Sequence, residues 1–564
     1  MQYDLKITGG TIVDGTGSQG FAGDVGIRDG KVVALGGAPG EARETIDARG
    51  RIVAPGFVDI HTHYDAQVLW DRSLSISPWH GVTTVVIGNC GFGVAPTRPQ
   101  HRELIMRTLE KVEGMSLEAL RQGLGLDWPF ESFPDYLDAV ERRGAAINLG
   151  VLAGHTPIRL NVMGEEAVRR AARPEEVKAM QRIVREAVEA GAIGFATSHA
   201  STHHGYDGNP VPSRLAEVSE IDALVGAMAE AGRGVMQATI GKSLFFDEFA
   251  AITKRHGVPV TWTAMLAGIA GPGSHRRHLE RSRQLIEVEG LNIIPQVSCR
   301  PLMFDFDFDA PFPFEMRPLF KRTMQTDRAG RRAIYADAAF RKAFKEDVGR
   351  DAERTALAGW VDRCVISIAP TDRSLEERPL TAVAAERGVD PVDLALDLSL
   401  ASDFAARFRI ALVNFEENEV AELLQFPGAV VALSDAGAHA SQLCDACYAT
   451  YLLGHWVREK GAFSIEQGVH MLTGKPAAVM GIRDRGRLAA GTPADVVVFD
   501  PTTIAAGQLR RVHDLPGGAD RLVAEATGID AVIVNGVTIR RQGKDMLKAD
   551  GKLPGRVLRG GAAA

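Results

Sequence analysis

The chain has 564 residues, of which 24% are charged and 45% are hydrophobic, and its formal net charge is −7. This composition is ordinary for a globular protein, and the charge gives no reason to expect nucleic acid or a membrane surface as a partner. No apolar run approaches the roughly 18 residues that a membrane span needs, and residues 1–6 do not resemble a signal peptide. The five cysteines are scattered and predict reduced thiols in a cytoplasmic protein.

Both ends of the chain are rich in predicted strands. Short β-like runs separated by Gly-rich turns fill the first 55 residues, and similar runs return at residues 486–488, 494–500 and 531–536. Because a sheet must bury one face, we expect the two ends to pair into one small β-sandwich domain, formed by residues 1–55 and 481–564.

Between these ends, apolar runs alternate with amphipathic helical stretches, which is typical of a parallel α/β fold. Eight runs are candidate strands: residues 56–61, 83–88, 148–153, 193–198, 234–239, 258–263, 292–298 and 429–434. They predict a (β/α)₈ barrel, a TIM barrel, over residues 56–480. A long segment at about residues 301–427 interrupts the rhythm between the last two strands, and we interpret it as an insertion that could cover the site.

The first predicted barrel strand ends in His61-Thr62-His63. Side chains alternate faces along a strand, so His61 and His63 point the same way and can bind one ion together. Either histidine alone would fit an ordinary polar residue at a strand end. The pair indicates a metal site, and imidazole ligands favour zinc or a related transition metal over a hard cation.

Other polar residues follow the remaining strands, where the active sites of such barrels gather. Asp435 follows the eighth strand, which barrel closure brings beside the first. Its carboxylate can bind the metal and accept a proton from water, although Asp is also a common helix N-cap. Cys90 follows the second strand as either a buried small hydrophobe or a thiolate ligand. Further strand-end residues, interpreted as substrate contacts, are His155, His199, His203, Gln237 and Arg300.

Four segments together resemble the amidohydrolase superfamily, and within it the N-acyl-D-amino-acid deacylases (D-aminoacylases). They are residues 53–65 around His61-Thr62-His63-Tyr64-Asp65, residues 81–91 with Gly88-Asn89-Cys90-Gly91, Ser434-Asp435, and residues 491–499. The resemblance implies a distorted (β/α)₈ barrel with a small β-sandwich and zinc-dependent hydrolysis of an N-acyl amide. It also implies that His61, His63 and Cys90 are metal ligands, that Asp435 is both ligand and general base, and that His155 lines the active site.

The chain departs from the family pattern at two places. The family's fifth and sixth strands end in histidine ligands, but residues 234–239 and 259–264 contain no histidine, so we expect one zinc ion rather than two. The family also carries a Pro-His-Pro-Arg segment after the aspartate, and residues 442–448 lack it. A substrate carboxylate is then bound elsewhere, by Arg300 or Arg214, or the substrate has none. The Cys-x-x-Cys pair in that segment, Cys444 and Cys447, is interpreted as structural or incidental.

The expected function is metal-dependent hydrolysis of the C–N amide bond of a small N-acyl compound, with an N-acyl-D-amino acid as the first candidate. Two alternatives stay open: hydrolysis of a cyclic amide, imide or other neutral amide, and an inactive homologue that binds a small ligand. The sequence leaves homo-oligomerisation open.

Overall fold

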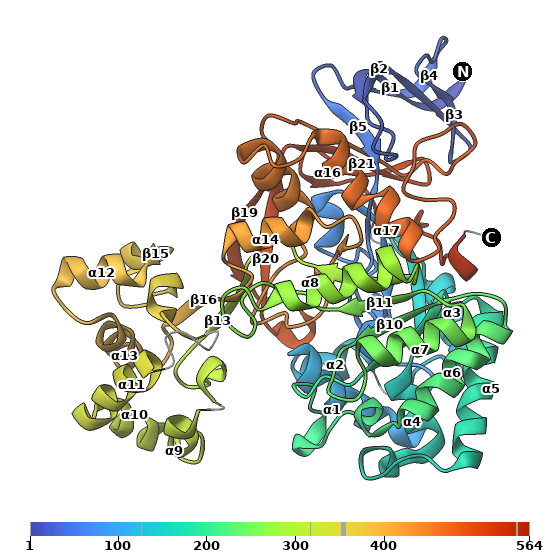
Figure 1. Cartoon of the computed structure of the whole chain (residues 1–564). Helices are drawn as coiled ribbons and strands as arrows, with labels where there is room; N and C mark the ends of the chain where they lie inside the picture. Colours follow the sequence, from blue (N-terminus) through green and yellow to red (C-terminus); the bar gives the residue numbers. More distant parts are fainter. Residues whose placement is uncertain (1, 126, 316, 351–356, 549–550, 563–564) are drawn as a thin grey trace.

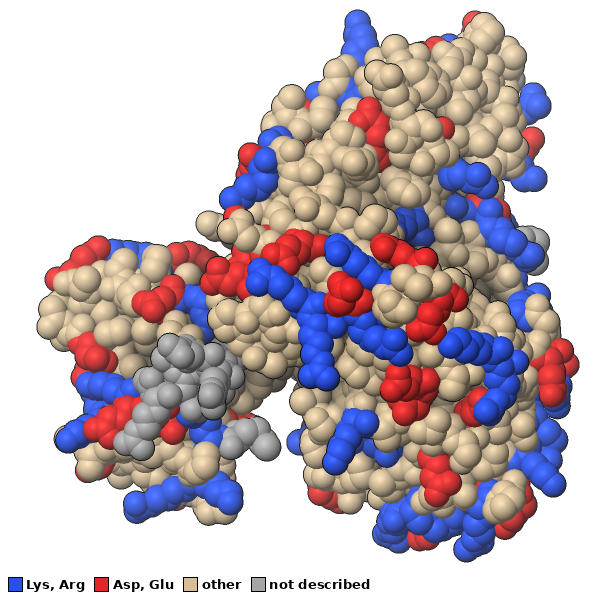
Figure 2. Space-filling view, in the orientation of Figure 1, with Lys and Arg blue, Asp and Glu red and all other residues tan. Residues whose placement is uncertain are grey.

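The computed structural model describes residues 2–125, 127–315, 317–350, 357–548 and 551–562, so parts of the predicted insertion and residues 563–564 of the predicted C-terminal range lie outside it. Figure 1 shows a central barrel, a β-rich part that carries the N-terminus, and an insertion that stands to one side. On the face drawn in Figure 2, acidic and basic side chains are interspersed. None of the helices in the described ranges combines the length and apolarity that a membrane crossing needs.

The predicted barrel is confirmed: eight parallel strands follow one another in chain order around the sheet. They are β6 (Phe57–Asp59), β7 (Val82–Ile87), β8 (Asn148–Gly154), β9 (Gly194–Ser198), β10 (Val235–Thr239), β11 (Val260–Thr263), β12 (Ile293–Val297) and β17 (Val430–Val431). All residues of β7 and β8 are buried, as expected of parallel strands covered on both faces.

The first and last strands meet just beyond their carboxyl ends. The Asp435 N–H donates to the His61 carbonyl (3.1 Å), and the His63 N–H donates to the Ala436 carbonyl (2.7 Å). Thr62 and Ala436 form the corresponding parallel bridge. We call these contacts the closing seam, because they join β6 to β17 and complete the barrel.

Gly56, just before β6, allows the first barrel strand to pack closely against the second. A Cβ atom on Gly56 would lie 2.1 Å from the Thr83 Oγ1, so only glycine allows β6 to approach β7 this closely.

The main helices of the barrel part of the chain are α1 (Arg102–Glu113), α2 (Leu117–Leu124), α3 (Phe133–Arg143), α4 (His155–Met163), α5 (Pro174–Ala190), α6 (Val218–Glu230), α7 (Phe246–His256), α8 (His275–Arg283), α14 (Glu417–Leu424), α15 (Tyr448–Tyr451), α16 (Ile465–Leu472) and α17 (Gly474–Val479).

The two ends of the chain share one nine-stranded sheet. Antiparallel pairing of β5 with β18, in which Val53 faces Val498, joins the N-terminal part to the C-terminal part. The strands of this sheet are β1 (Tyr3–Ile12), β2 (Phe21–Arg28), β3 (Lys31–Leu35), β4 (Ala42–Asp47), β5 (Ile52–Pro55), β18 (Val496–Phe499), β21 (Ile529–Val534), β22 (Val537–Arg541) and β23 (Lys544–Asp545). A separate hairpin consists of β19 (Ala505–Val512) and β20 (Arg521–Thr527).

The insertion has its own sheet and its own aromatic core. In its Phe-Asp alternation, Phe306 and Phe308 enter that core, whereas Asp305 and Asp307 both pair with Arg407. Period-two alternation places the rings and the carboxylates on opposite faces of the chain. Its elements are β13 (Leu302–Phe306), α9 (Lys321–Met324), α10 (Arg328–Ala336), α11 (Ala338–Arg350), β14 (Cys364–Ile368), β15 (Arg378–Pro379), α12 (Leu380–Arg387), α13 (Pro391–Ala401) and β16 (Arg407–Val413).

Candidate metal centre

Three predicted ligands meet at the carboxyl ends of β6 and β7. One ligand atom each of His61, His63 and Cys90 lies within 4.8 Å of the others, and all three residues are buried. Cys90 follows β7 in a left-handed backbone conformation (φ 56°), and its Sγ lies 3.4 Å from the His61 Nε2. A non-glycine residue held in this conformation stores strain, which is common at functional sites.

Asp435 lies beside this cluster. Its Oδ1 is 3.4 Å from the His61 Nε2 and 3.8 Å from the His63 Nε2. Its side chain is 24% exposed, so one edge of the cluster is open to solvent. The closing seam fixes the position of Asp435, because its own backbone N–H is bonded to the carbonyl of His61, a predicted ligand.

The charges of the cluster favour a thiolate beside imidazolium or a cation. Burial raises the pKa of the Cys90 thiol, but the charge of His61 and its hydrogen bond outweigh burial and bring the pKa down to about 7. Burial likewise opposes protonation of His63, but the nearby Glu113 carboxylate raises the pKa of His63 well above its ordinary value. The site therefore concentrates negative charge around two imidazoles, as a cation site requires.

Three residues outside the cluster orient its members. The Gln296 Oε1 lies 2.7 Å from the His61 Nδ1, and the Glu113 Oε1 lies 3.1 Å from the His63 Nδ1. These contacts engage the outer nitrogen of each ring and leave the Nε2 atoms for the centre. The predicted residue Gln237 belongs here too, because its Oε1 accepts a hydrogen bond from the Cys90 N–H (2.6 Å).

A cavity of about 140 Å³ opens beside the cluster. Apolar side chains form much of its wall, and the two strands that lack the family histidines present Thr239 and Thr263 instead. Leu302 is the described residue of the insertion that reaches this wall. The lining residues are His61, His63, Cys90, Phe92, Val112, Glu113, His203, Thr239, Thr263, Ala264, Leu266, Leu302, Leu433, Asp435 and His439.

Of the predicted substrate contacts, His203 lines the cavity. Its Nδ1 lies 2.7 Å from the Ser198 Oγ, and its ring packs against Phe92. His199, in contrast, lies outside the lining, with its Nδ1 3.0 Å from the Ser243 Oγ.

His155 and Arg300 also lie outside the lining, contrary to the expected substrate contacts. The two ring nitrogens of His155 contact Thr197 (2.8 Å) and Glu220 (2.9 Å). The buried Arg300 donates to the Cys444 carbonyl and pairs with Asp445 (3.1 Å). Both ring nitrogens of His155 are engaged, and the Nη1 of Arg300 is bonded to the segment after β17, so we propose neither residue as a substrate contact.

Glu113, Gln296 and His439 also lie at the site, although their positions in the sequence did not predict it. Gln296 lies on the predicted seventh strand, near its carboxyl end, which is a signal that could have drawn attention to it. Glu113 is the last residue of α1, and His439 lies in the irregular segment after β17. Only the tertiary fold brings these two residues to the site.

Known proteins resemble this chain in sequence and in fold. The sequence model of the amidohydrolase family matches residues 44–300 and 328–540. A D-aminoacylase from Alcaligenes xylosoxydans xylosoxydans is 29% identical over 545 residues, covering 95% of this chain and 94% of that protein. An N-acyl-D-glutamate deacylase from the same organism is 29% identical over 581 residues, covering 99% and 97%. The crystal structure of an N-acyl-D-glutamate deacylase from Bordetella bronchiseptica, complexed with zinc and a phosphonate inhibitor, superposes with a TM-score of 0.67 at 27% identity, covering 99% and 100%.

Proposed function

This chain belongs to the amidohydrolase family, and we propose that it is a metal-dependent deacylase that hydrolyses the amide bond of an N-acyl-D-amino acid. One observation carries the proposal: His61, His63 and Cys90 converge within 4.8 Å directly beside the Asp435 carboxylate. Relatives that match nearly the whole chain include a D-aminoacylase and an N-acyl-D-glutamate deacylase, which supports this substrate class over the cyclic-amide and ligand-binding alternatives.

The donor set fits a zinc ion. Two imidazoles, one thiol of lowered pKa and a carboxylate are the ligand types that zinc takes in proteins, and Gln296 and Glu113 support the two rings from outside. His61, His63, Cys90 and Asp435 would hold the ion. Among the described residues this is the one group of three or more such ligands, which supports one ion rather than two.

The proposed chemistry divides between the ion and the chain. When bound, zinc supplies Lewis acidity that polarises the amide carbonyl and acidifies water. Asp435 accepts the proton of the attacking water and then returns it to the leaving nitrogen. Its neighbours His61 and His63 hold it beside the cluster, while the apolar cavity wall excludes other water molecules from the reacting carbonyl.

The substrate would occupy the cavity beside the cluster. His203 offers its Nε2 there, because its Nδ1 is engaged by Ser198. Directly behind His203, the Arg214 Nη1 donates to the His203 carbonyl (3.0 Å), and no ion pair joins Arg214 to an acidic side chain within the described ranges. Arg214 and Arg300 both lie outside the cavity lining, but Arg300 is paired with Asp445, so we propose Arg214 as the cation that attracts the substrate carboxylate.

An activity and metal assay tests the proposal. The purified protein should release free amino acid from N-acetyl-D-methionine faster than from its L-enantiomer, and should contain about one zinc per chain by elemental analysis. Removal of the metal by a chelator should abolish turnover, and added zinc should restore it. Turnover that persists after complete metal removal, or an absence of turnover on every N-acyl-D-amino acid offered to the zinc-loaded protein, would overturn the proposal.

A further inference from the structure

A second cavity lies at the opposite end of the barrel from the metal cluster. Its volume is about 280 Å³, and it is formed at the amino ends of strands β9 to β12 by Ile193, Val235, Pro259 and Asn292. The C-terminal end of α17 and the turn at Gly560 close it from the other side. The metal ligands follow the carboxyl ends of the strands, so the two sites are separated by the length of the barrel.

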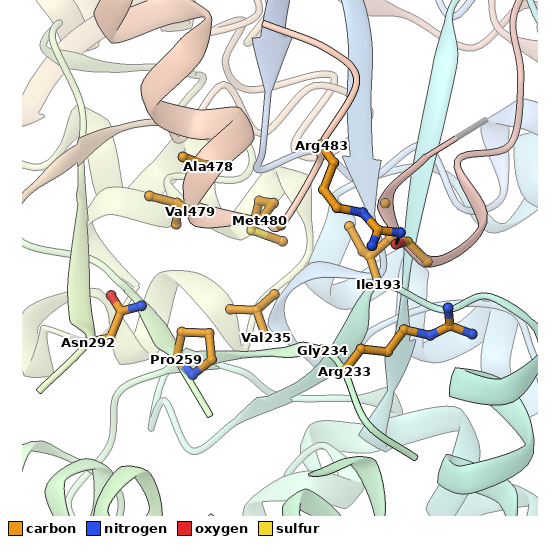
Figure 3. A pocket seen from close by; sticks show the side chains of 13 residues that line it. Ile193, Arg233, Gly234, Val235, Pro259, Asn292, Ala478, Val479, Met480 and Arg483 are labelled. Carbon is orange, nitrogen blue, oxygen red and sulfur yellow. Dashed lines mark hydrogen bonds between the residues drawn. The ribbon is translucent and has the colours of Figure 1, made fainter. Parts of the chain in front are cut away.

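One side of this cavity is apolar. Figure 3 shows Val479, the last residue of α17, and Met480, which follows it, above Val235 and Pro259 from the barrel, with no charged side chain among them. Ile193, Val235 and Met480 are each less than 5% exposed, so their side chains form a fixed wall. Such a wall accepts a hydrocarbon group.

The other side carries two arginines from distant parts of the sequence. In Figure 3 the guanidinium groups of Arg233 and Arg483 approach one another from below and above. The Arg233 Nη2 donates to the Val188 carbonyl (3.1 Å), and the Arg483 Nη2 donates to the Gly560 carbonyl (3.3 Å). Neither arginine forms an ion pair with a described Asp or Glu. Each guanidinium has five N–H donors, so most of them stay available at this edge.

A neighbouring cavity of about 580 Å³ is also lined by arginine side chains. It shares Ala478, Gly481 and Arg483 with the first cavity, and Arg487 also lines it. No described Asp or Glu lines either cavity, although acidic residues outnumber basic ones in the whole chain. An uncompensated basic edge on an acidic protein favours an anion at this position.

We infer that the cavity between Arg233 and Arg483 is a second binding site, which takes an amphipathic carboxylate. The carboxylate lies between the two guanidinium groups, whose fork geometry matches its two oxygens, and the hydrocarbon tail packs against Val235, Pro259 and Met480. The site acts independently of the metal centre, so it does not rest on the proposed deacylase activity.

Titration calorimetry on the full-length, metal-loaded protein tests the inference, with sodium octanoate as the probe. Octanoate should bind, whereas neutral octanamide and inorganic phosphate should bind at least about tenfold more weakly, because each lacks one half of the ligand. Arg233→Gln and Arg483→Gln should each weaken octanoate binding about tenfold or more. Arg277→Gln is the matched control, because Arg277 is an exposed arginine of α8 outside both cavities, and it should leave binding unchanged.

A further variant separates a specific site from a folding defect. Arg483→Lys keeps the charge but loses the fork, so it should bind octanoate more weakly than the native protein while unfolding at the same temperature. Octanoate binding that survives both Arg→Gln substitutions, or that octanamide or phosphate equals, would overturn the inference.

Discussion

Asp435→Asn is the sharpest test of the proposed proton transfer. The Asp435 Oδ1 lies 3.4 Å and 3.8 Å from the Nε2 atoms of the two histidines, so the carboxylate is placed to move a proton at the centre of the cluster. Asparagine has the same shape but cannot take up that proton. General acid–base catalysis contributes about 10²- to 10⁴-fold, so kcat/KM should fall by that factor, or about 3–5 kcal/mol in the barrier.

The fold should tolerate this substitution. Asp435 joins the closing seam through its backbone N–H, which asparagine keeps, and asparagine accepts the positive φ of 45° at this position. The assay compares kcat/KM, bound zinc and unfolding temperature for the native protein and the variant at saturating zinc. Asp29→Asn is the matched control, because Asp29 has a similar φ of 52° and is 91% exposed, far from any cluster. Activity within tenfold of native in a zinc-loaded Asp435→Asn protein would refute the assigned role.

Four further substitutions test the remaining assignments. Cys90→Ser should lower zinc affinity at least about tenfold by competition with a chelator, because it removes the soft ligand; unchanged affinity would exclude Cys90 from the ligand set. Glu113→Gln should weaken zinc binding about 10- to 100-fold by freeing the His63 Nδ1, whereas Glu110→Gln on the same helix should not. Arg214→Gln should raise KM about tenfold for an N-acyl-D-amino acid but not for its carboxamide, and equal effects on both would refute carboxylate binding. Burial lowers the pKa of His80 from 6.5 to about 3. Below about pH 6.5 the unfolded chain therefore binds a proton at His80, whereas the folded protein does not, and the free energy of unfolding decreases as the pH falls. Between pH 7 and 5 this costs about 2 kcal/mol, and urea unfolding of His80→Gln should show a correspondingly smaller loss.

The barrel could be predicted from the sequence because its strands are continuous apolar runs. Residues 82–87 and 148–154 are buried on both faces of the sheet, and strands of this kind are recognised in a sequence as nearly continuous apolar runs. The candidate ligands could be proposed because His61 and His63 follow the first strand two residues apart, and Cys90 and Asp435 follow other strands. Their assigned roles stay predictions that the experiments above test.

The supporting residues could not be predicted, for a physical reason. Glu113 reaches His63 only because the tertiary fold places the C-terminal end of α1 beside the site, and no local pattern encodes that approach. His155 shows the opposite case: it follows a strand, as an active-site residue would, but its ring nitrogens contact Thr197 and Glu220. Position at a strand end places a residue near the site, whereas tertiary hydrogen bonds decide where its side chain points.

The closing seam also sets an order of events during synthesis. His61, His63 and Cys90 leave the ribosome more than 340 residues before Asp435, which at about 5–20 residues per second is an interval of roughly 17–75 s. Throughout that time the nascent chain carries the three proposed metal ligands without the strand that aligns them with Asp435. At the proposed centre, a metal captured early would be held by a flexible segment, and barrel closure would be the step that brings Asp435 to it.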